Sequence, residues 1–368
     1  MSAKPKSKRA LARRLWRQQL GHRLRLPLYL ARRILLLIPQ ILLISFITFA
    51  LVRLLPGDPA RLALGPLAPD AAVAALREKM HLDLPIWDQY LLWLRRALSG
   101  DFGGSWANGT QVGDDLLQRI PVTLELIFLS LIVIALFLVP LAIVTASRTR
   151  NRPIRLLRTI TFGYSMLAGA LPDFLLGLLL IFVFFTHLNV LPGPEGRLGI
   201  LDTSPPFVTG SILIDSALAG DLDAFWSGAW HLVMPVFTLA FVYGAPIFKM
   251  LRSQMEIALD AEFTTYGEAL GLPPRVVFLR AARVAAAPTV VIVGTVLMFL
   301  LGGDVLVESV FNLSGLGQYA VQAIVTADYA PVQGFVCFAA VFTMLVYLAV
   351  DLIHFAMDPR IKIGGSHD

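Results

Sequence analysis

The chain has 368 residues, of which 57% are hydrophobic and only 15% charged, and its mean hydropathy is +0.71. Soluble domains are typically about 45–50% apolar and about 25% charged, so the composition excludes an ordinary soluble protein and predicts an integral membrane protein. The single cysteine, Cys337, excludes a disulfide within the chain and a cysteine-based metal site. The net charge of +6 is not accompanied by an RNA- or DNA-binding motif, so nucleic acid is not expected as a partner.

The first 33 residues form a strongly basic arm, with eleven Lys or Arg residues and no acidic residue. An apolar run follows over 34–52, which is long enough to span a bilayer and too long for the apolar region of a signal peptide. No small-residue cleavage site follows this run, so we expect an uncleaved first span. The arm either binds anionic lipid or is a solvated tail.

The segment after the first span is mixed in character. The motif PGDP at 56–59 breaks the chain, and two helices are expected after it, over 70–81 and 85–98. The second helix carries three aromatic residues that suit a position at the membrane interface, namely Trp87, Tyr90 and Trp93.

Five further apolar segments predict an all-α protein with six transmembrane helices. The segments lie at about 124–146, 159–185, 232–248, 288–302 and 332–350, and Pro172 and Asp173 interrupt the second of these five. Two of the connecting segments are expected to be loops, a Gly- and Pro-rich stretch at 186–231 and an acidic stretch at 303–331.

Charge asymmetry predicts the orientation of the spans. The basic arm, the loop at 147–158, the polar stretch at 249–288 and the C-terminal tail hold 23 Lys or Arg residues, whereas the loops on the opposite side hold 7. Because positively charged loops stay in the cytoplasm, both termini and the 249–288 stretch are expected there.

The polar stretch at 249–288, which we call the island, lies between two strongly apolar segments. Within it Phe263, Tyr266 and Leu270 recur at i, i+3 and i+7, which predicts a short amphipathic helix. Gly271 supplies a stop signal, and two prolines follow it. Such a helix, held between two spans, is shaped either for contact with a partner or for lying on lipid headgroups as an ordinary surface loop.

The sequence contains none of the common motifs for chemistry. It has no phosphate-binding GxxxxGK[ST] loop, no HExxH motif, no His/Cys cluster and no nucleophile elbow. We therefore expect neither an enzyme nor a metal or cofactor site in this chain alone.

Ionisable residues in or near the spans are candidate functional groups, because buried charges are costly in a bilayer. Glu125 and Asp351 lie at expected span ends, where the interface can solvate them. Asp173 follows a proline within a span and is either a residue of a translocation path or a satisfied polar group at a helix break. One such carboxylate without internal repeats gives little support to an ion-coupled secondary transporter.

Several stretches, in this order along the chain, resemble a known family. They are YLARRILLLIPQILLISFITFALVRLLPGDPA, HLDLPIWDQYLLWLRRALSGDFGGSW, IPVTLEL, LPDFLLGLLL, the island in the form EFTTYGEALGLPPRVVFLRAA, VLVESVFNLSGLGQYAVQAIVTADYAPVQG and the closing DPRIK. Together they span about residues 28–362. They resemble the inner-membrane permease subunits of bacterial ABC importers for dipeptides, oligopeptides and nickel, specifically the B member of the permease pair.

The resemblance implies a type I ABC importer permease fold in the bacterial cytoplasmic membrane, and it identifies the island as the EAA loop, whose coupling helix docks on an ATPase subunit. The residues that would form this contact and its turn are Glu262, Phe263, Thr265, Tyr266, Gly267, Glu268, Leu270 and Gly271. The sequence departs from the family pattern at Tyr266, where small residues are usual. It also departs between Gly267 and Gly271, where a basic residue is common.

The implied organisation has five parts. They are a basic cytoplasmic arm (1–30), a first transmembrane helix (31–55), an external segment with interfacial helices (56–119), a type-1 ABC transmembrane domain (120–355) that contains the coupling loop at about 249–288, and a cytoplasmic tail (356–368).

The implied function is import of short peptides, delivered by an extracytoplasmic solute-binding protein, through a pathway shared with a homologous second permease. Two ATPase subunits would hold ATP and Mg²⁺, so no cofactor is expected in this chain. The alternatives are import of nickel chelates or another small solute, an ion-coupled secondary transporter, and a membrane scaffold or receptor that moves no solute.

Overall fold

The computed structural model describes residues 33, 35–51, 53, 58–65, 67–147 and 151–357. Within these ranges the regular secondary structure is helical, apart from one isolated bridge between Gly104 and Gln111. The expected basic arm at 1–30 and most of the expected tail at 356–368 lie outside the described residues.

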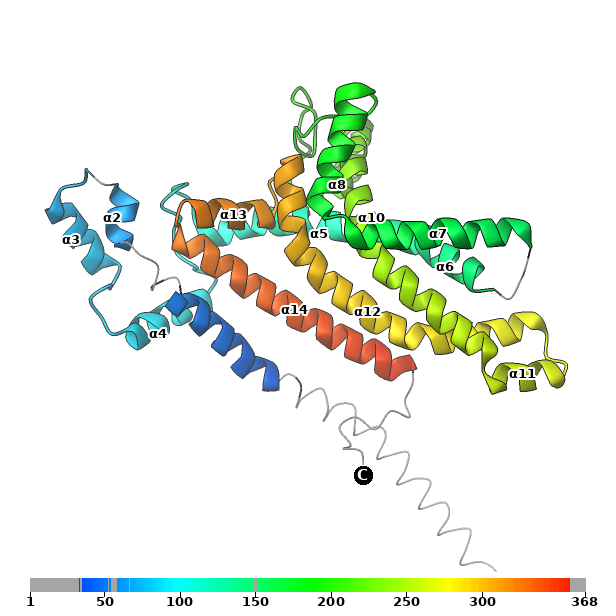
Figure 1. Cartoon of the computed structure of the whole chain (residues 1–368). Coiled ribbons are helices and arrows are strands. Elements are labelled where there is room, and N and C mark those ends of the chain that lie inside the picture. The colour runs from blue at the N-terminus through cyan, green and yellow to red at the C-terminus, as the bar shows by residue number, and fades with distance from the viewer. Residues whose placement is uncertain are drawn as a thin grey trace, which may run out of the picture.

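Among the described residues, four helical stretches are long and apolar enough to cross a membrane (Figure 1). The first is α5 (Val112–Val133), which continues through a π-helical turn (Ile134–Leu138) into α6 (Val139–Ala146). The others are α10 (Leu222–Asp260), the first 29 residues of α12 (Pro274–Phe311), and α14 (Tyr329–Met357). The main apolar core joins α5, α10 and α12 through buried side chains, among them Leu126, Ile127, Leu239, Leu300 and Phe311, and partly buried residues of α14 pack against it.

The segment predicted as the third span is sharply broken. It consists of α7 (Arg152–Ala170) and α8 (Asp173–Leu180), which continues as a π-helical segment (Ile181–His187), and the two parts are bent by 108°. The break lies where it was predicted, because a residue before proline avoids the helical conformation and Leu171 is extended, with φ −89° and ψ 125°. Counted as one span, the bent pair is a fifth candidate. The predicted number of six therefore stays a prediction.

Two of the predicted spans are much shorter than the helices that contain them. The segment at 232–248 is the middle of the 39-residue α10, whose internal Pro235 and Pro246 do not end the helix. The segment at 288–302 lies within the 38-residue α12. The expected loop at 303–331 is wrong for most of its length, because α12 continues to Phe311 and α13 (Leu316–Val325) follows. Polar residues mark where a helix can leave the bilayer, and they do not by themselves end it.

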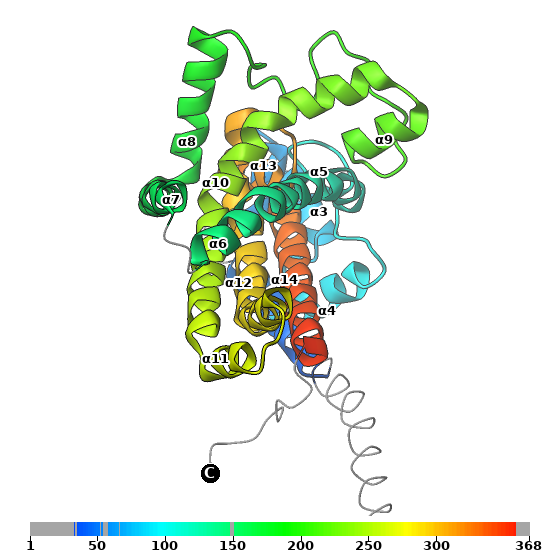
Figure 2. The same ribbon diagram turned by 90° about the vertical axis from the view of Figure 1, so that its right-hand side faces the viewer.

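The Gly- and Pro-rich stretch at 186–231 is likewise only partly a loop. It contains α9 (Ile212–Ala219), and α10 already begins at Leu222. Figure 2 shows α9 packed beside the first turns of α10, far from α11.

The N-terminal part is a chain of shorter helices. The first helix (Leu35–Leu51) is followed by α2 (Pro59–Leu64), α3 (Asp70–Lys79) and α4 (Ile86–Ala97), which confirms the two helices predicted after the PGDP motif. The aromatic residues of α4 pack on the first helix: the ring of Trp87 stacks on Phe46 at 4.3 Å, and the Tyr90 and Ser45 hydroxyls are 2.8 Å apart. Tyr90 is buried by this contact.

Candidate functional site

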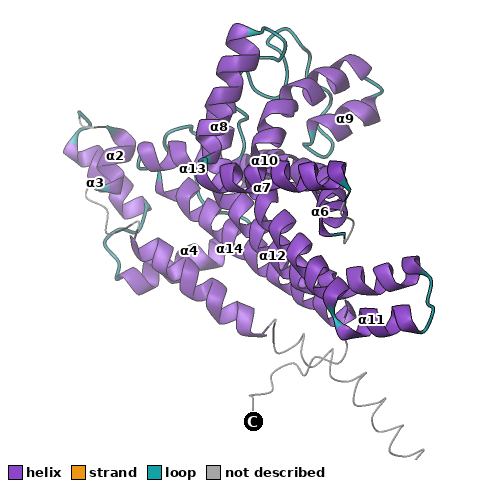
Figure 3. Ribbon diagram, turned by 45° about the vertical axis from the view of Figure 1, so that its right-hand side comes forward, coloured by secondary structure: helices purple, strands orange, loops and turns teal. Residues whose placement is uncertain are grey.

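The island is divided among three helices. Its first residues complete α10, its middle forms the short α11 (Glu262–Ala269), and its last residues begin α12. Figures 1 and 3 show α11 at the end of the α10–α12 pair, opposite α8. The short helix predicted from the spacing of its apolar residues is therefore confirmed.

The start of α11 is fixed by one buried hydroxyl. Ala261 is extended, with φ −70° and ψ 152°, and serves as the hinge residue between α10 and α11. The Thr264 hydroxyl donates to the carbonyl of Ala258 at 2.7 Å, and Thr264 is only 1% exposed. This bond ties the first turn of α11 to the last turns of α10 and sets the direction in which α11 leaves.

The end of α11 is a left-handed glycine turn. Gly271 has φ +74°, a conformation that is strained for residues with a Cβ. Its N–H donates to the carbonyl of Glu268 at 2.9 Å, and the N–H of Leu272 donates to that of Gly267 at 3.1 Å. These two bonds form a Schellman motif, which satisfies carbonyls that a helix end leaves free. The chain then enters α12 through Pro273, so the predicted stop signal is confirmed.

The turn leaves one face of α11 buried and the other exposed. Thr264 and Gly267 are its buried residues. The apolar stripe predicted from the sequence points away from the protein, with Phe263 41%, Tyr266 67% and Leu270 63% exposed. A hollow of about 660 Å³ lies along this outer face and is lined by Asp260, Glu262, Phe263, Thr265, Tyr266 and Ala269.

Of the eight residues predicted for this site, six are thus surface residues and two shape the turn. Glu262, Phe263, Thr265, Tyr266, Glu268 and Leu270 are exposed. Gly267 is buried against Leu272 and Val277, and Gly271 supplies the left-handed turn.

Charge is segregated along the island. Its acidic residues fall together in 256–268, around α11, and its basic residues lie on both sides, in 249–252 and 275–283. Arg252 and Glu256 meet at the boundary, with Nε and Oε1 3.0 Å apart. An acidic tip carrying exposed aromatic side chains is a surface that suits a protein partner better than anionic headgroups.

The helices behind α11 are firmly packed. A second apolar core joins α10, α12 and α6 through buried side chains, among them Phe248, Met255, Ala142 and Ala285. Displacing α11 would therefore move the ends of two long helices with it.

Asp173, the residue predicted as a translocation-path candidate, is not brought to α11. It is the first residue of α8, at the bend after α7, and lies beside the middle of α10. Its Oδ1 accepts from the N–H of Phe174 at 2.7 Å, and its Oδ2 accepts from the Tyr243 hydroxyl at 2.8 Å. These bonds match the interpretation of a satisfied polar group at a helix break, and the role in a path stays a prediction.

The expectation that the interface solvates Glu125 is wrong. Glu125 is 8% exposed and accepts from the Ser211 hydroxyl at 2.6 Å and from the N–H groups of Ile212 and Leu213 at 3.1 and 3.0 Å. Arg197 lies 3.3 Å from the same carboxylate. The carboxylate caps the free N–H groups at the start of α9, which explains its burial.

Glu308 and Asp328 are among the buried carboxylates that were not singled out from the sequence. Glu308 is fully buried near the end of α12, where it accepts from the Thr123 hydroxyl and from the N–H of Gln318 at 3.0 Å. Burial raises the pKa of Glu308, although the hydrogen bonds oppose this shift. Asp328, just before α14, is 1% exposed and accepts from the Ser105 hydroxyl at 2.6 Å. The signal that could have found Glu308 is that it is a lone acid in the apolar run VLVESVF.

No arrangement for catalysis is apparent around the island, and the described residues contain no group of three or more His, Cys, Asp or Glu that could hold a metal ion. The geometry offers a contact surface on a rigid support.

Comparison with known proteins gives matches over most of the chain. Residues 138–363 match the family described as "Binding-protein-dependent transport system inner membrane component", and residues 26–127 match the N-terminal component of the same systems. The chain is 37% identical over 324 residues to the probable D,D-dipeptide transport system permease protein DdpB of Escherichia coli (strain K12), covering 88% of this chain and 94% of the relative.

Two other relatives are covered almost completely. Identity to the dipeptide transport system permease protein DppB of the same strain is 32% over 339 residues, covering 91% of this chain and 98% of the relative. Identity to its glutathione transport system permease protein GsiC is 30% over 335 residues, with the same coverage.

Proposed function

The chain belongs to the family of binding-protein-dependent transport system inner membrane components, and from this premise we propose that it forms half of the pathway through which an ATP-driven importer moves short peptides. As a family member it is a multi-pass permease of the bacterial inner membrane and not an enzyme. The family implies a solute-binding protein and ATPase subunits as partners. A homologous second permease would supply the other half of the pathway, and two ATPase subunits would hold ATP and Mg²⁺.

The peptide class rests on the relatives, two of which are named for dipeptides. Nickel chelates or another small solute are the alternative. Uptake of a labelled dipeptide and of labelled nickel into cells with and without the gene tests the class. Loss of dipeptide uptake alone is expected, whereas loss of nickel uptake alone would contradict it.

The observation that carries the coupling role is the exposed apolar face of α11. Exposed apolar patches with charged rims mark interaction sites, and Phe263 and Tyr266 project from a helix whose own base is buried. We propose that Glu262, Phe263, Thr265, Tyr266, Glu268 and Leu270 contact an ATPase subunit. Gly267 and Gly271 would hold the turn that presents them.

The proposed mechanism is alternating access. ATP binds more tightly to the closed arrangement of the ATPase subunits, and this difference in affinity provides the free energy that shifts the permease between its states. Because α10 and α12 share the core around Phe248 and Met255, a push on α11 would reach the spans as a rigid-body movement. The carboxylate of Asp173, at the break between α7 and α8, is proposed to line the path.

We also propose six spans with both termini in the cytoplasm. The four long helices, the bent pair and the first helix would make up this number. The first helix has 17 residues, which corresponds to about 25 Å at 1.5 Å per residue, slightly less than a hydrocarbon core of about 30 Å. The domain limits expected from the sequence, including the type-1 domain at 120–355, belong to the same proposal.

Co-purification from native membranes tests the coupling role. The double variant Phe263→Ser, Tyr266→Ser should reduce the recovered ATPase subunits at least about tenfold, which is about 1.4 kcal/mol of binding free energy, while the permease level is kept. Leu279→Ser is the matched control, because Leu279 is 65% exposed at the start of α12 but lies outside the stripe. Equal recovery from the double variant and the wild type would contradict the proposal, as would dipeptide uptake without any ATPase.

A further inference from the structure

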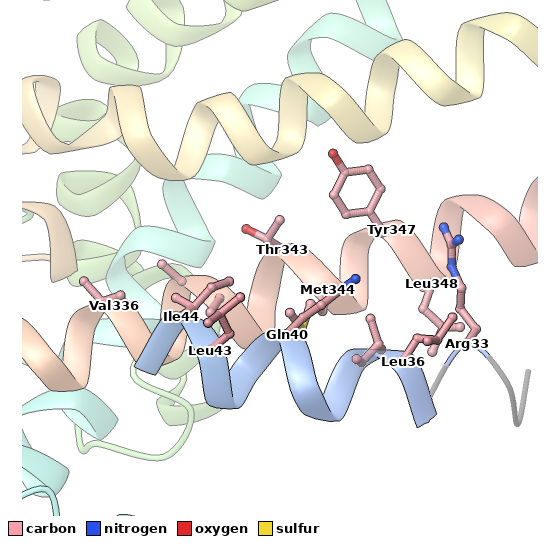
Figure 4. A pocket seen from close by; sticks show the side chains of 13 residues that line it. Arg33, Leu36, Gln40, Leu43, Ile44, Val336, Thr343, Met344, Tyr347 and Leu348 are labelled. Carbon is pink, nitrogen blue, oxygen red and sulfur yellow. The ribbon is translucent and has the colours of Figure 1, made fainter. Parts of the chain in front are cut away.

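A groove of about 660 Å³ runs between the first helix and α14 (Figure 4). Each helix contributes one face to it: Leu36, Leu43 and Ile44 come from the first helix, and Ala340 and Met344 are among the residues of α14. Two of the α14 residues that line it, Ala339 and Ala340, have small side chains.

The walls of the groove are apolar and outward-facing. On the first helix Leu36 is 47% and Leu43 58% exposed. Such side chains can face the bilayer. Water does not fill an apolar space of this kind, and an empty space would forfeit dispersion contacts. The groove therefore fits an apolar chain from the bilayer or an apolar helix of another protein.

The length of the groove matches one acyl chain. The groove extends from Arg33 to Ile44, about 16 Å along a helix. This is close to half of a hydrocarbon core of about 30 Å, which is the depth of one leaflet below its headgroups.

The two ends of the groove differ in charge. Arg33 stands at one end, where its Nη2 lies 2.6 Å from Oδ2 of Asp351, and its side chain is still 39% exposed. A guanidinium has five N–H donors, more than one carboxylate uses. Arg33 is also the last of the eleven basic residues at 1–33, a segment without any acidic residue. Basic clusters next to a membrane span attract anionic lipid headgroups.

We propose that this groove binds an anionic phospholipid, with one acyl chain between the first helix and α14 and the phosphate at Arg33. Such a lipid matches both features of the site, the apolar slot and the positive charge at one end. The bound chain would hold the first helix against α14.

The test is the phospholipid content of the full transporter complex, purified in mild detergent and measured by native mass spectrometry. Ala340→Trp fills the groove and should reduce tightly bound phospholipid at least about fivefold. Val341→Trp is the matched control, because Val341 is on the same helix and 40% exposed but does not line the groove. It should leave the lipid in place.

A second pair of variants tests the headgroup without altering the groove. After exchange into nanodiscs of phosphatidylcholine with phosphatidylglycerol, Arg33→Gln should abolish the preference for phosphatidylglycerol. Asp351→Asn removes the same ion pair but leaves the guanidinium, so it should keep the preference. This comparison remains decisive even if Ala340→Trp fails to fold.

Three outcomes would overturn the proposal. One is an unchanged lipid count in a folded Ala340→Trp complex. Another is the same lipid preference in Arg33→Gln and Asp351→Asn. The third is release of the second permease by Ala340→Trp with the lipid count unchanged, which would assign the groove to a protein helix.

Discussion

The acidic residues around α11 are exposed, whereas several carboxylates far from α11 are buried. Glu262 and Glu268 lie on an exposed helix beside exposed aromatic rings. Glu125, Glu308 and Asp328 are buried and accept hydrogen bonds from hydroxyl and N–H groups of distant segments. A buried carboxylate is tolerated only when it is paired in this way. The far side is thus stabilised from within, whereas α11 offers its groups to a partner.

The largest effect is expected from removing one of the buried carboxylates, Glu308. Glu308→Ala would leave the Thr123 hydroxyl and the N–H of Gln318 without their acceptor and would open a cavity. We expect a loss of about 3 kcal/mol in the free energy of unfolding, measured by denaturation of the purified chain in detergent. Ser309→Ala, at the adjacent exposed position, should change it by less than about 0.5 kcal/mol. A loss no larger than in this control would show that the buried bonds do not stabilise the fold.

The pH dependence of stability is a second test of the burial of Glu308. Since burial raises the pKa of Glu308 above its ordinary value of 4.5, the folded state binds this proton more tightly than the unfolded state. The stabilisation that comes from this tighter proton binding is therefore fully present below the pKa of Glu308 in the unfolded state. It is lost as the pH rises through the pKa of Glu308 in the folded state. As the pH rises from 4.5, the melting temperature of the wild type should fall relative to that of Glu308→Gln. A difference that is constant with pH would contradict this.

The turn after α11 should respond to a single methyl group. Gly271→Ala places a Cβ at φ +74°, which should destabilise the turn by about 1 kcal/mol and weaken recovery of the ATPase subunits several-fold. Gly163→Ala serves as the control, because Gly163 lies within α7 with open space around it. That change should be neutral or slightly stabilising, so equal behaviour of the two variants would rule out a special role for the turn.

The smallest effect is expected for the exposed ion pair at the base of the acidic tip. Arg252→Gln removes an i,i+4 pair with Glu256, both partly exposed. Such pairs contribute about 0.3–0.5 kcal/mol, so the melting temperature should change little. A large loss would show that Arg252 has a role beyond this pair.

Local signals carried the sequence predictions that succeeded. The spacing of Phe263, Tyr266 and Leu270 predicts α11, Gly271 predicts its end, and Pro172 predicts the break between α7 and α8. Each depends on a few neighbouring residues, so the sequence alone reveals it. The 108° bend at the break depends on packing and was not predictable.

The failures share a different cause. The lengths of α10 and α12 were underestimated because polar residues were taken as helix ends, although a helix continues through them when no residue breaks it. Glu125 was expected to be solvated, but its partners Arg197 and Ser211 are more than 70 residues away in sequence. Contacts of this kind form only when the chain has folded, and no local sequence pattern predicts them.

Photo-crosslinking from α11 tests the central claim most directly. Benzoylphenylalanine in place of Tyr266 can be activated in membranes that contain the whole transporter, with the same residue at Trp226 as the comparison, since Trp226 is equally exposed, at 68%, but lies at the opposite end of α10. We predict a crosslinked product with an ATPase subunit from position 266 and none from position 226. Crosslinking of position 266 to lipid alone, in a complex that still hydrolyses ATP and imports its solute, would contradict the account.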